Sequence, residues 1–138
     1  MRHLSTVDLK VEESSGVTVV HFPEEVDVVN APAIRERVLR LLNSGVSEMV
    51  LDLTGTRFLD SAGLHIIVRA HGRGTALSIP LSVAIPEEGM VRRVFDLTAM
   101  ARLVPTTVGL PDPRSAAPAP SLSCSTAGPR RRGRKPRR

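Results

Sequence analysis

Residues 51–64 carry the sequence LDLTGTRFLDSAGL, in which an apolar run leads through a turn into the start of a helix. Residues 49–53 are apolar apart from Asp52, as in a buried strand, and residues 54–57 have the composition of a turn. Asp60 and Ser61 are both good N-cap residues, and a helical pattern follows at once. The stretch therefore predicts a strand, a loop and a helix whose first turn presents a serine hydroxyl, free N–H groups and the positive end of the helix dipole.

The composition predicts one small domain and a tail. The 138 residues include no Trp or Tyr and three Phe, so the core must be aliphatic. Residues 1–110 hold 11 Lys+Arg and 13 Asp+Glu, which gives a net charge of −2. Residues 111–138 hold 8 Lys+Arg and 1 Asp, which gives a net charge of +7. We expect a folded domain over residues 1–110 and a disordered Pro/Ala/Arg-rich tail over residues 111–138.

Three features favour a cytoplasmic protein. Cys124 is the single cysteine, so no internal disulfide is expected. No run of about 18 apolar residues suggests a membrane span. The N-terminus lacks the apolar segment of a secretory signal.

Upstream of the central stretch, the patterns predict two strands and a helix. Alternating residues 6–11 and Val/Thr-rich residues 17–22 are expected to form a hairpin around a turn at residues 12–16. An acidic loop, residues 24–30, leads into a helix that Asn30 is expected to cap. Gly45 is expected to end this helix, and its buried face is predicted to hold Ile34, Val38, Leu41 and Leu42.

Downstream, the next helix is expected to stop at residues 72–74 and to be followed by a strand over residues 76–85. Its predicted buried face is Leu64, Ile67, Val68 and His71. Pro80 within the strand indicates an edge position or a bulge. A third helix is expected to start at residues 86–88, with an apolar face made of Met90, Val91, Val94, Phe95 and Leu97.

A short last strand at residues 102–104 completes the order ββαβαβα(β). Strands that alternate with helices imply an α/β fold, in which helices pack on a largely parallel sheet whose central member is residues 49–53.

Residues 60–64, Asp-Ser-Ala-Gly-Leu, after a strand at residues 50–53, resemble the signature of the STAS domain of bacterial anti-sigma-factor antagonists. Residues 91–98 match the place of the family's third helix, and residues 25–27 look like its first loop. The resemblance covers roughly residues 6–105.

This resemblance implies a non-enzymatic binding protein without cofactor or metal, in which Ser61 is the phosphoacceptor. Its implied partners are an anti-sigma factor that is a GHKL-type serine kinase and a PP2C-type phosphatase. The unphosphorylated form would bind the anti-sigma factor and free a sigma factor, and phosphorylation would end the binding. The implied partner-binding residues are Asp27, Asn30, Asp60, Ser61, Ala62, Gly63 and His65.

The chain departs from the family pattern in two places. Many relatives carry a second hydroxyl residue where this chain has Ala62. The family usually closes with a fourth helix, which is opposed here by prolines at positions 111, 113, 118 and 120.

The central motif also admits simpler interpretations. Asp60 and Ser61 can serve only as a cap, and Gly63 only as a site of close packing. A serine hydrolase is disfavoured because residues 59–63 lack the first glycine of G-x-S-x-G. The spacing of His65 and His71 does not suit a metal pair on one helical face.

Two other function classes stay open. The arginine-rich tail suggests a nucleic-acid-associated protein, because about eight positive charges would bind anionic surfaces nonspecifically. A STAS-like adaptor in another regulatory or lipid-transport assembly is the third alternative.

Overall fold

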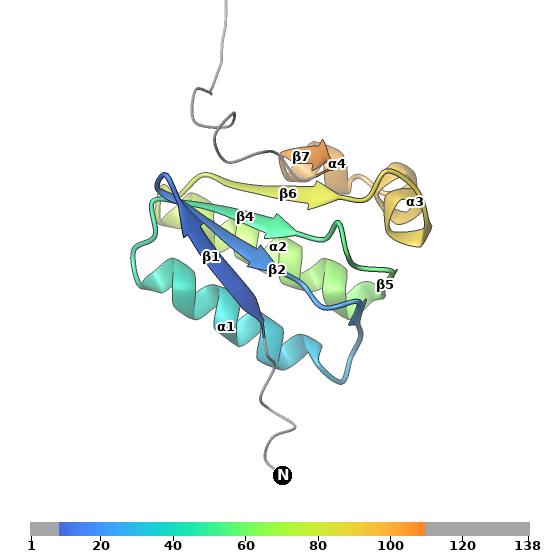
Figure 1. The fold of residues 1–138 in the computed structure, drawn as a ribbon, viewed down its shortest axis with the longest axis horizontal. Coiled ribbons are helices and arrows are strands. Elements are labelled where there is room, and N and C mark those ends of the chain that lie inside the picture. Colours follow the sequence, from blue (N-terminus) through green and yellow to red (C-terminus); the bar gives the residue numbers. More distant parts are fainter. Residues whose placement is uncertain (1–8, 110–138) are drawn as a thin grey trace, which may run out of the picture.

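The computed structural model describes residues 9–109, and the N-terminal part of the first expected strand and the tail lie outside them (Figure 1). Five strands form a sheet in the order β1-β2-β4-β6-β7. They are β1 (Lys10–Ser14), β2 (Val17–His21), β4 (Glu48–Asp52), β6 (Leu81–Ile85) and β7 (Thr106–Val108). The β1–β2 hairpin is antiparallel, and the other pairs are parallel. The largely parallel sheet and the central place of residues 49–53 are thus confirmed.

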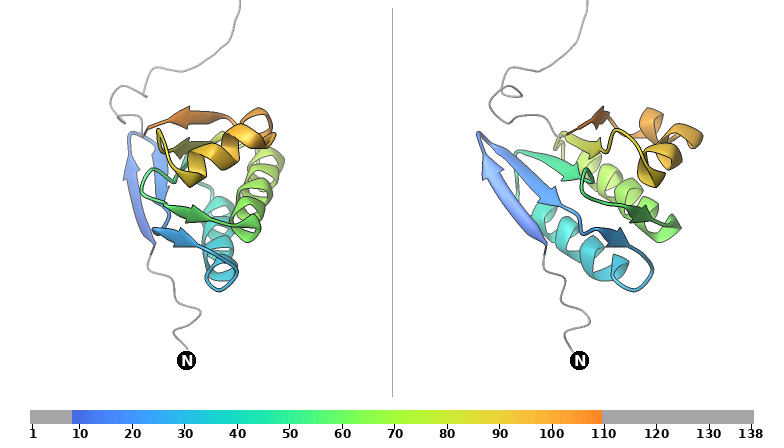
Figure 2. Two further views of the ribbon diagram at one scale, coloured as in Figure 1. Left: turned by 90° about the vertical axis from the view of Figure 1, so that its right-hand side faces the viewer. Right: turned by 45° about the vertical axis from the view of Figure 1, so that its right-hand side comes forward.

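Four helices accompany the sheet within the described residues. Helices α1 (Ala31–Asn43) and α2 (Ser61–Ala76) lie side by side against one face of the sheet (Figure 2). Helices α3 (Met90–Leu97) and α4 (Met100–Leu103) follow β6 and complete the connection to β7. None of these helices combines the length and the apolar composition needed to cross a membrane.

The main core lies between the sheet and the helices. Met49, Leu51 and Leu53 point into it, because alternate side chains of a strand share one face. Val50 points to the opposite face, where it forms a small cluster with Val19 and Ala84. The central strand is therefore apolar on both faces, as its sequence predicts.

A second sheet was not predicted. It consists of two parallel strands, β3 (Glu25–Val26) and β5 (Phe58–Leu59). Each has two residues, too few to show a periodic pattern, so only the tertiary structure reveals the pairing.

The first strand ends later than expected. Lys10–Ser14 are paired with β2, so residues 12–14, predicted to be a turn, belong to the strand. The turn is confined to Ser15 and Gly16, which both have positive φ angles, of 55° and 83°. Exposed charged side chains in an edge strand hide the apolar alternation that a sequence pattern relies on.

Helix α2 does not stop at residues 72–74 but continues to Ala76. Gly74 is buried in it, and a Cβ there would lie 3.0 Å from the Ile79 carbonyl oxygen, so the glycine permits a close approach to the chain that enters β6. The buried face of the helix is Gly63, Ile66, Ile67, Ala70 and Gly74. The expected face was rotated, since Val68 is exposed and Leu64 only half-buried, whereas His71 is half-buried and His65 exposed, as expected of a half-buried and a surface histidine.

Pro80 lies before β6 instead of inside it, and β6 is neither bulged nor at an edge. The Pro80 carbonyl oxygen accepts a hydrogen bond from Met49 N at 3.0 Å. The proline therefore marks the entry to an interior strand, where it costs no ladder hydrogen bond.

The last elements also differ from the prediction. Helix α3 begins at Met90 and leaves Leu97 79% exposed, although Val91 and Phe95 are buried as expected. Residues 102 and 103 end the short helix α4, and the final strand lies after Pro105. Thr106 and Thr107 lack the apolar pattern of a buried strand, so the sequence did not indicate β7.

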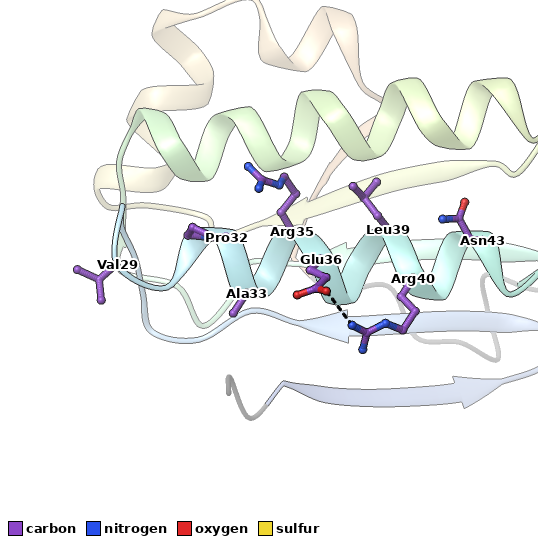
Figure 3. Close-up of a pocket in the computed structure, with 8 residues that line it drawn as sticks. All are labelled: Val29, Pro32, Ala33, Arg35, Glu36, Leu39, Arg40 and Asn43. Atoms are coloured by element: carbon purple, nitrogen blue, oxygen red, sulfur yellow. Dashed lines mark ion pairs between the residues drawn. The ribbon is translucent and has the colours of Figure 1, made fainter. Parts of the chain in front are cut away.

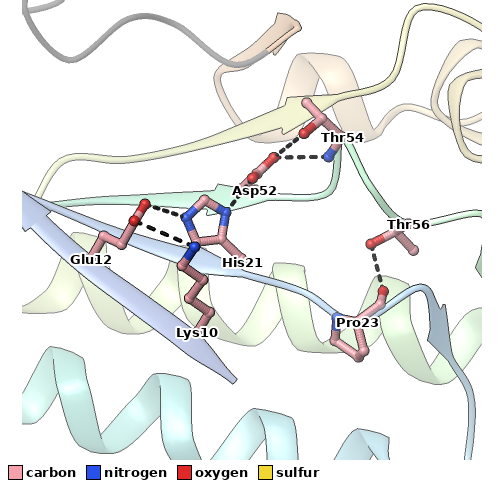
Figure 4. A network of polar contacts seen from close by, with 7 residues as sticks. All are labelled: Lys10, Glu12, His21, Pro23, Asp52, Thr54 and Thr56. Atoms are coloured by element: carbon pink, nitrogen blue, oxygen red, sulfur yellow. Dashed lines mark hydrogen bonds and ion pairs between the residues drawn. The ribbon is translucent and has the colours of Figure 1, made fainter. Parts of the chain in front are cut away.

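A polar network ties the strand ends to the central loop (Figure 4). The His21 ring nitrogens lie 2.5 Å from Asp52 Oδ2 and 2.8 Å from Glu12 Oε1. Asp52 Oδ1 also accepts hydrogen bonds from Thr54 N and Thr54 Oγ1, at 2.9 and 2.6 Å. The network thereby holds three strands and the turn after β4 in one arrangement.

Glu12 at the edge of this network provides a pH test. The hydrogen bond from His21, helped by the charge of Lys10, lowers the pKa of the Glu12 carboxyl. A lowered pKa stabilises the fold above the ordinary pKa, and this contribution is lost as the pH falls through the lowered value. We expect the melting temperature to fall between about pH 6 and about pH 3, and to fall more in the parent chain than in Glu12→Gln. The difference between the two should be small, because the Glu12 side chain is exposed. Equal slopes in thermal melts would contradict the assignment.

Candidate functional site

The candidate site begins at the N-terminus of α2, where Asp60 and Ser61 have different tasks. Asp60 is the N-cap: its Oδ1 accepts hydrogen bonds from Ala62 N at 2.9 Å and Gly63 N at 3.2 Å. Ser61 is the first helical residue and is exposed. Its hydroxyl has no hydrogen-bond partner among residues 9–109, so it is free to react or to be recognised.

The small β3–β5 sheet brings the acidic loop to this helix terminus. Asp60 N donates to the Val26 carbonyl oxygen at 3.3 Å, directly beyond the paired residues Val26 and Leu59. A groove of about 160 Å³ separates the loop and α1 from α2. Its lining residues are Val28, Ala31, Pro32, Arg35, Ala62, His65 and Ile66.

The loop itself is held by its own side chains. Asp27 Oδ1 accepts hydrogen bonds from Val29 N at 3.0 Å and Asn30 N at 3.3 Å. Asn30 Oδ1 accepts one from Asp27 N at 3.0 Å, while its Nδ2 donates to the Glu25 carbonyl oxygen at 2.8 Å. Asn30 occupies the N-cap position of α1 but makes no capping hydrogen bond with its side chain, so that expectation was wrong. Its amide folds the loop instead.

Gly63 is buried beneath the small sheet. A Cβ at this position would overlap the Leu59 side chain and would lie 3.0 Å from Val26 Cγ1. The geometry thus supports the packing interpretation of this glycine, and a contact between Gly63 and a partner stays a prediction.

The structure brings all seven predicted site residues to one end of the domain. Ser61 and His65 are exposed, and Asp27, Asn30, Asp60 and Ala62 are half-buried. Three exposed apolar side chains beside them were not predicted: Val28 is 70% exposed, Val29 72% and Phe58 42%. Two adjacent valines in an otherwise acidic loop were the sequence signal for this surface.

The arrangement suits recognition and modification. Ser61 follows the cap carboxylate of Asp60, His65 is one helical turn away, and the exposed Val28 shares a groove with Ala62 and His65. Residues 9–109 contain no group of three or more His, Cys, Asp or Glu side chains arranged to hold a metal.

Comparison with known proteins identifies the family. The model of the STAS domain matches residues 8–110. The chain therefore belongs to the STAS domain family.

Individual relatives agree with this assignment. An anti-sigma factor antagonist from Mycobacterium paratuberculosis superposes with a TM-score of 0.70 at 26% identity, over 82% of this chain and 95% of that one. The anti-sigma factor antagonist SpoIIAA in its unphosphorylated form gives a TM-score of 0.66 at 15% identity, over 79% and 94%, which shows a shared fold. The anti-sigma-F factor antagonist RsfB of Mycobacterium tuberculosis is 29% identical over 62 residues, 45% of this chain. The match spans only about half of RsfB, 51% of its length.

The close packing at Gly63 can be tested against a second glycine in the same helix. Gly63→Ala should lower the free energy of unfolding by about 1–3 kcal/mol, because the methyl group meets Leu59 and Val26. Gly72→Ala should raise it by about 0.5–1 kcal/mol, since Gly72 is an exposed helical glycine with open space around it. Denaturant titrations measure both, and a stabilising Gly63→Ala would refute the packing role.

The capping assignment yields a second pair of variants. Asp60→Ala should cost about 0.5–2 kcal/mol of stability, because two N–H groups lose their acceptor. Ser61→Ala should cost less than about 0.5 kcal/mol, as for an exposed residue without such partners. Chemical denaturation gives both values, and the reverse order would show that Ser61 is the cap.

Proposed function

We propose that this chain is an anti-sigma-factor antagonist that acts in the cytoplasm and is switched by phosphorylation of Ser61. In the unphosphorylated form it binds an anti-sigma factor, a GHKL-type serine kinase, and so releases a sigma factor. Phosphorylation of Ser61 by this kinase ends the binding, and a PP2C-type phosphatase restores it. The contact surface is the set of residues around the α2 N-terminus together with Val28, Val29 and Phe58.

One observation carries the proposal: Ser61 is exposed and its hydroxyl has no hydrogen-bond partner in the described part of the chain, because Asp60 supplies the helix cap. A kinase can therefore modify the hydroxyl without dismantling the start of α2. The family membership and the names of the relatives supply the partner class. SpoIIAA is known in unphosphorylated and phosphorylated forms, which accords with a switch of this kind.

Electrostatics explains why a phosphate would act at the interface. A phosphoserine carries a charge of about −1.5 to −2 at neutral pH. The dipole of α2 stabilises part of this charge, so the fold should survive. Asp60, Asp27 and Glu25 lie at the same end, where Glu24 is paired with Arg57 at 3.4 Å, so the phosphate would add its charge to a group of carboxylates. A partner packed over Ser61 would meet bulk and charge together.

Two substitutions at one position test the switch. Ser61→Ala should keep binding to the purified anti-sigma factor and abolish phosphorylation by it. Ser61→Asp should weaken binding by about 2–5 kcal/mol, because the like-charge and steric penalties act at a desolvated contact. Isothermal titration calorimetry gives the affinities, and phosphosite mass spectrometry after incubation with ATP gives the acceptor.

The controls separate the switch from general effects of charge. Ser47 is an exposed serine before β4, at the opposite end of that strand from the central loop, and Ser47→Asp should bind normally. Removal of residues 111–138 should also leave the binding intact, whereas a protein that acts through its basic tail would lose its activity. Equal affinities of Ser61→Asp and Ser61→Ala would reject the switch, and phosphate on another residue would reject the site.

A further inference from the structure

The charges of the folded domain are segregated. Helices α1 and α2 contain five arginines and one acid, Glu36, a net charge of +4. The rest of residues 9–109 contains five Lys+Arg and 11 Asp+Glu, a net charge of −6. The domain is weakly acidic as a whole, so this separation gives it one basic face, formed by the two helices.

The basic face is built around a groove between the helices, which we call the α1–α2 seam. Arg35, Leu39 and Asn43 lie at positions i, i+4 and i+8 of α1 and extend on the side of α2 (Figure 3). Leu39 and Asn43 line a groove of about 520 Å³ together with five residues of α2. These are Val68, Arg69, Gly72, Arg73 and Ala76.

The α1–α2 seam leads toward the Ser61 site. Arg35 lines the smaller groove of Ala62 and His65, and it also lines a hollow of about 690 Å³ on α1 together with Leu39 and Asn43. Leu39 and Asn43 in turn line the groove along α2, so neighbouring hollows that share residues extend from Ala62, next to Ser61, to Asn43 and Arg73. The floor of the α1–α2 seam has apolar side chains, Leu39 and the 37%-exposed Val68, and its rims are basic.

Two arginines of the α1–α2 seam are available to a partner. Arg40 is paired with Glu36 at 3.1 Å, and Arg73 Nε donates to Asn43 Oδ1 at 2.8 Å. Within residues 9–109, Arg35 and Arg69 have no carboxylate within ion-pair distance. Two guanidinium groups thus remain to recognise acidic groups with paired hydrogen bonds.

We propose that the α1–α2 seam binds an acidic, amphipathic segment of the same partner that covers Ser61. This inference rests on the proposed function and adds the chemistry of the partner. The 13 residues of α1 extend about 20 Å, so a segment of about four helical turns matches the length of the α1–α2 seam. Its apolar residues contact Leu39 and Val68, and its carboxylates pair with Arg35 and Arg69.

Other occupants fit the surface less well. The chain's own residues 130–138 are rich in arginine, and like charge keeps them from this face. Nucleic acid would meet Glu24, Glu25, Asp27 and Asp60 at the Ser61 end, and no aromatic side chain lines the groove for base stacking. An acidic protein segment confined to the α1–α2 seam needs no aromatic lining, and the rest of its partner can carry a different charge over the acidic end.

Charge reversal of single arginines tests the proposal with the purified anti-sigma factor as probe. Arg35→Glu and Arg69→Glu should each weaken binding at least about tenfold and reduce its dependence on salt. Arg102→Glu on α4 makes the same change in net charge outside the α1–α2 seam and should bind as the parent chain does. Unchanged affinity of both variants would overturn the proposal, as would an equal loss in Arg102→Glu.

A photo-crosslinker identifies the occupant. Benzoylphenylalanine at Val68 should capture an Asp/Glu-rich peptide of the anti-sigma factor, and the same group at Leu103, 48% exposed on α4, should not. Capture of a second copy, of residues 110–138 or of added duplex DNA at Val68 would overturn the proposal. If Ser61→Asp loses binding while the arginine variants do not, the α1–α2 seam fails and the proposed function stands. If only the arginine variants lose binding, the proposed Ser61 switch fails, and binding of the partner to the α1–α2 seam stands.

Discussion

The site depends on the close approach of helix α2 to the small sheet at Gly63. Because this residue has no Cβ, Leu59 and Val26 pack directly on the first turn of the helix. The β3–β5 pairing then lies across the helix terminus, and Asp60 N reaches the Val26 carbonyl oxygen. Two segments that are about 30 residues apart in the chain thus form one surface, on which the acidic loop and Ser61 are neighbours.

Within this surface, adjacent residues have separate tasks: Asp60 caps the helix, and Ser61 presents a hydroxyl that the cap does not use. The Asp60 carboxylate accepts two backbone N–H groups that would otherwise be orphaned, so the first turn of α2 needs nothing from Ser61. A serine at the cap position would hold those N–H groups with its own hydroxyl oxygen, so modification of that oxygen would disturb the cap. The Asp-Ser order of the motif therefore lets the helix keep its cap whatever happens to the serine.

The sequence predicted what periodicity and local chemistry encode. The order of elements, the central strand with Leu51, helix α1 and the Asp60–Ser61 joint all follow from patterns of several residues. The β3–β5 pairing did not, because two-residue strands have no period. The sequence pattern also placed the end of α2 at its glycines, but the helix continues through Gly74. The close approach of the Ile79 carbonyl leaves little room for a Cβ there, so tertiary packing explains this glycine. At the site, Val28 and Val29 were missed because exposure is a property of the folded surface and not of residue type.

The separation of charges raises the question of how far along α2 a phosphate at Ser61 would change the electrostatic potential. Arg69 is eight residues beyond Ser61 in α2, about 12 Å along the axis at 1.5 Å per residue. Exposed charges at this distance are largely screened, because the Debye length is about 8 Å at physiological salt. The phosphate would therefore change the potential at the acidic end and leave the middle of the basic face nearly unaltered. If the proposed switch and seam both operate, the two ends of the surface would act separately. The helices would attract an acidic partner in either state, and the charge at Ser61 would decide whether that partner can close over the site.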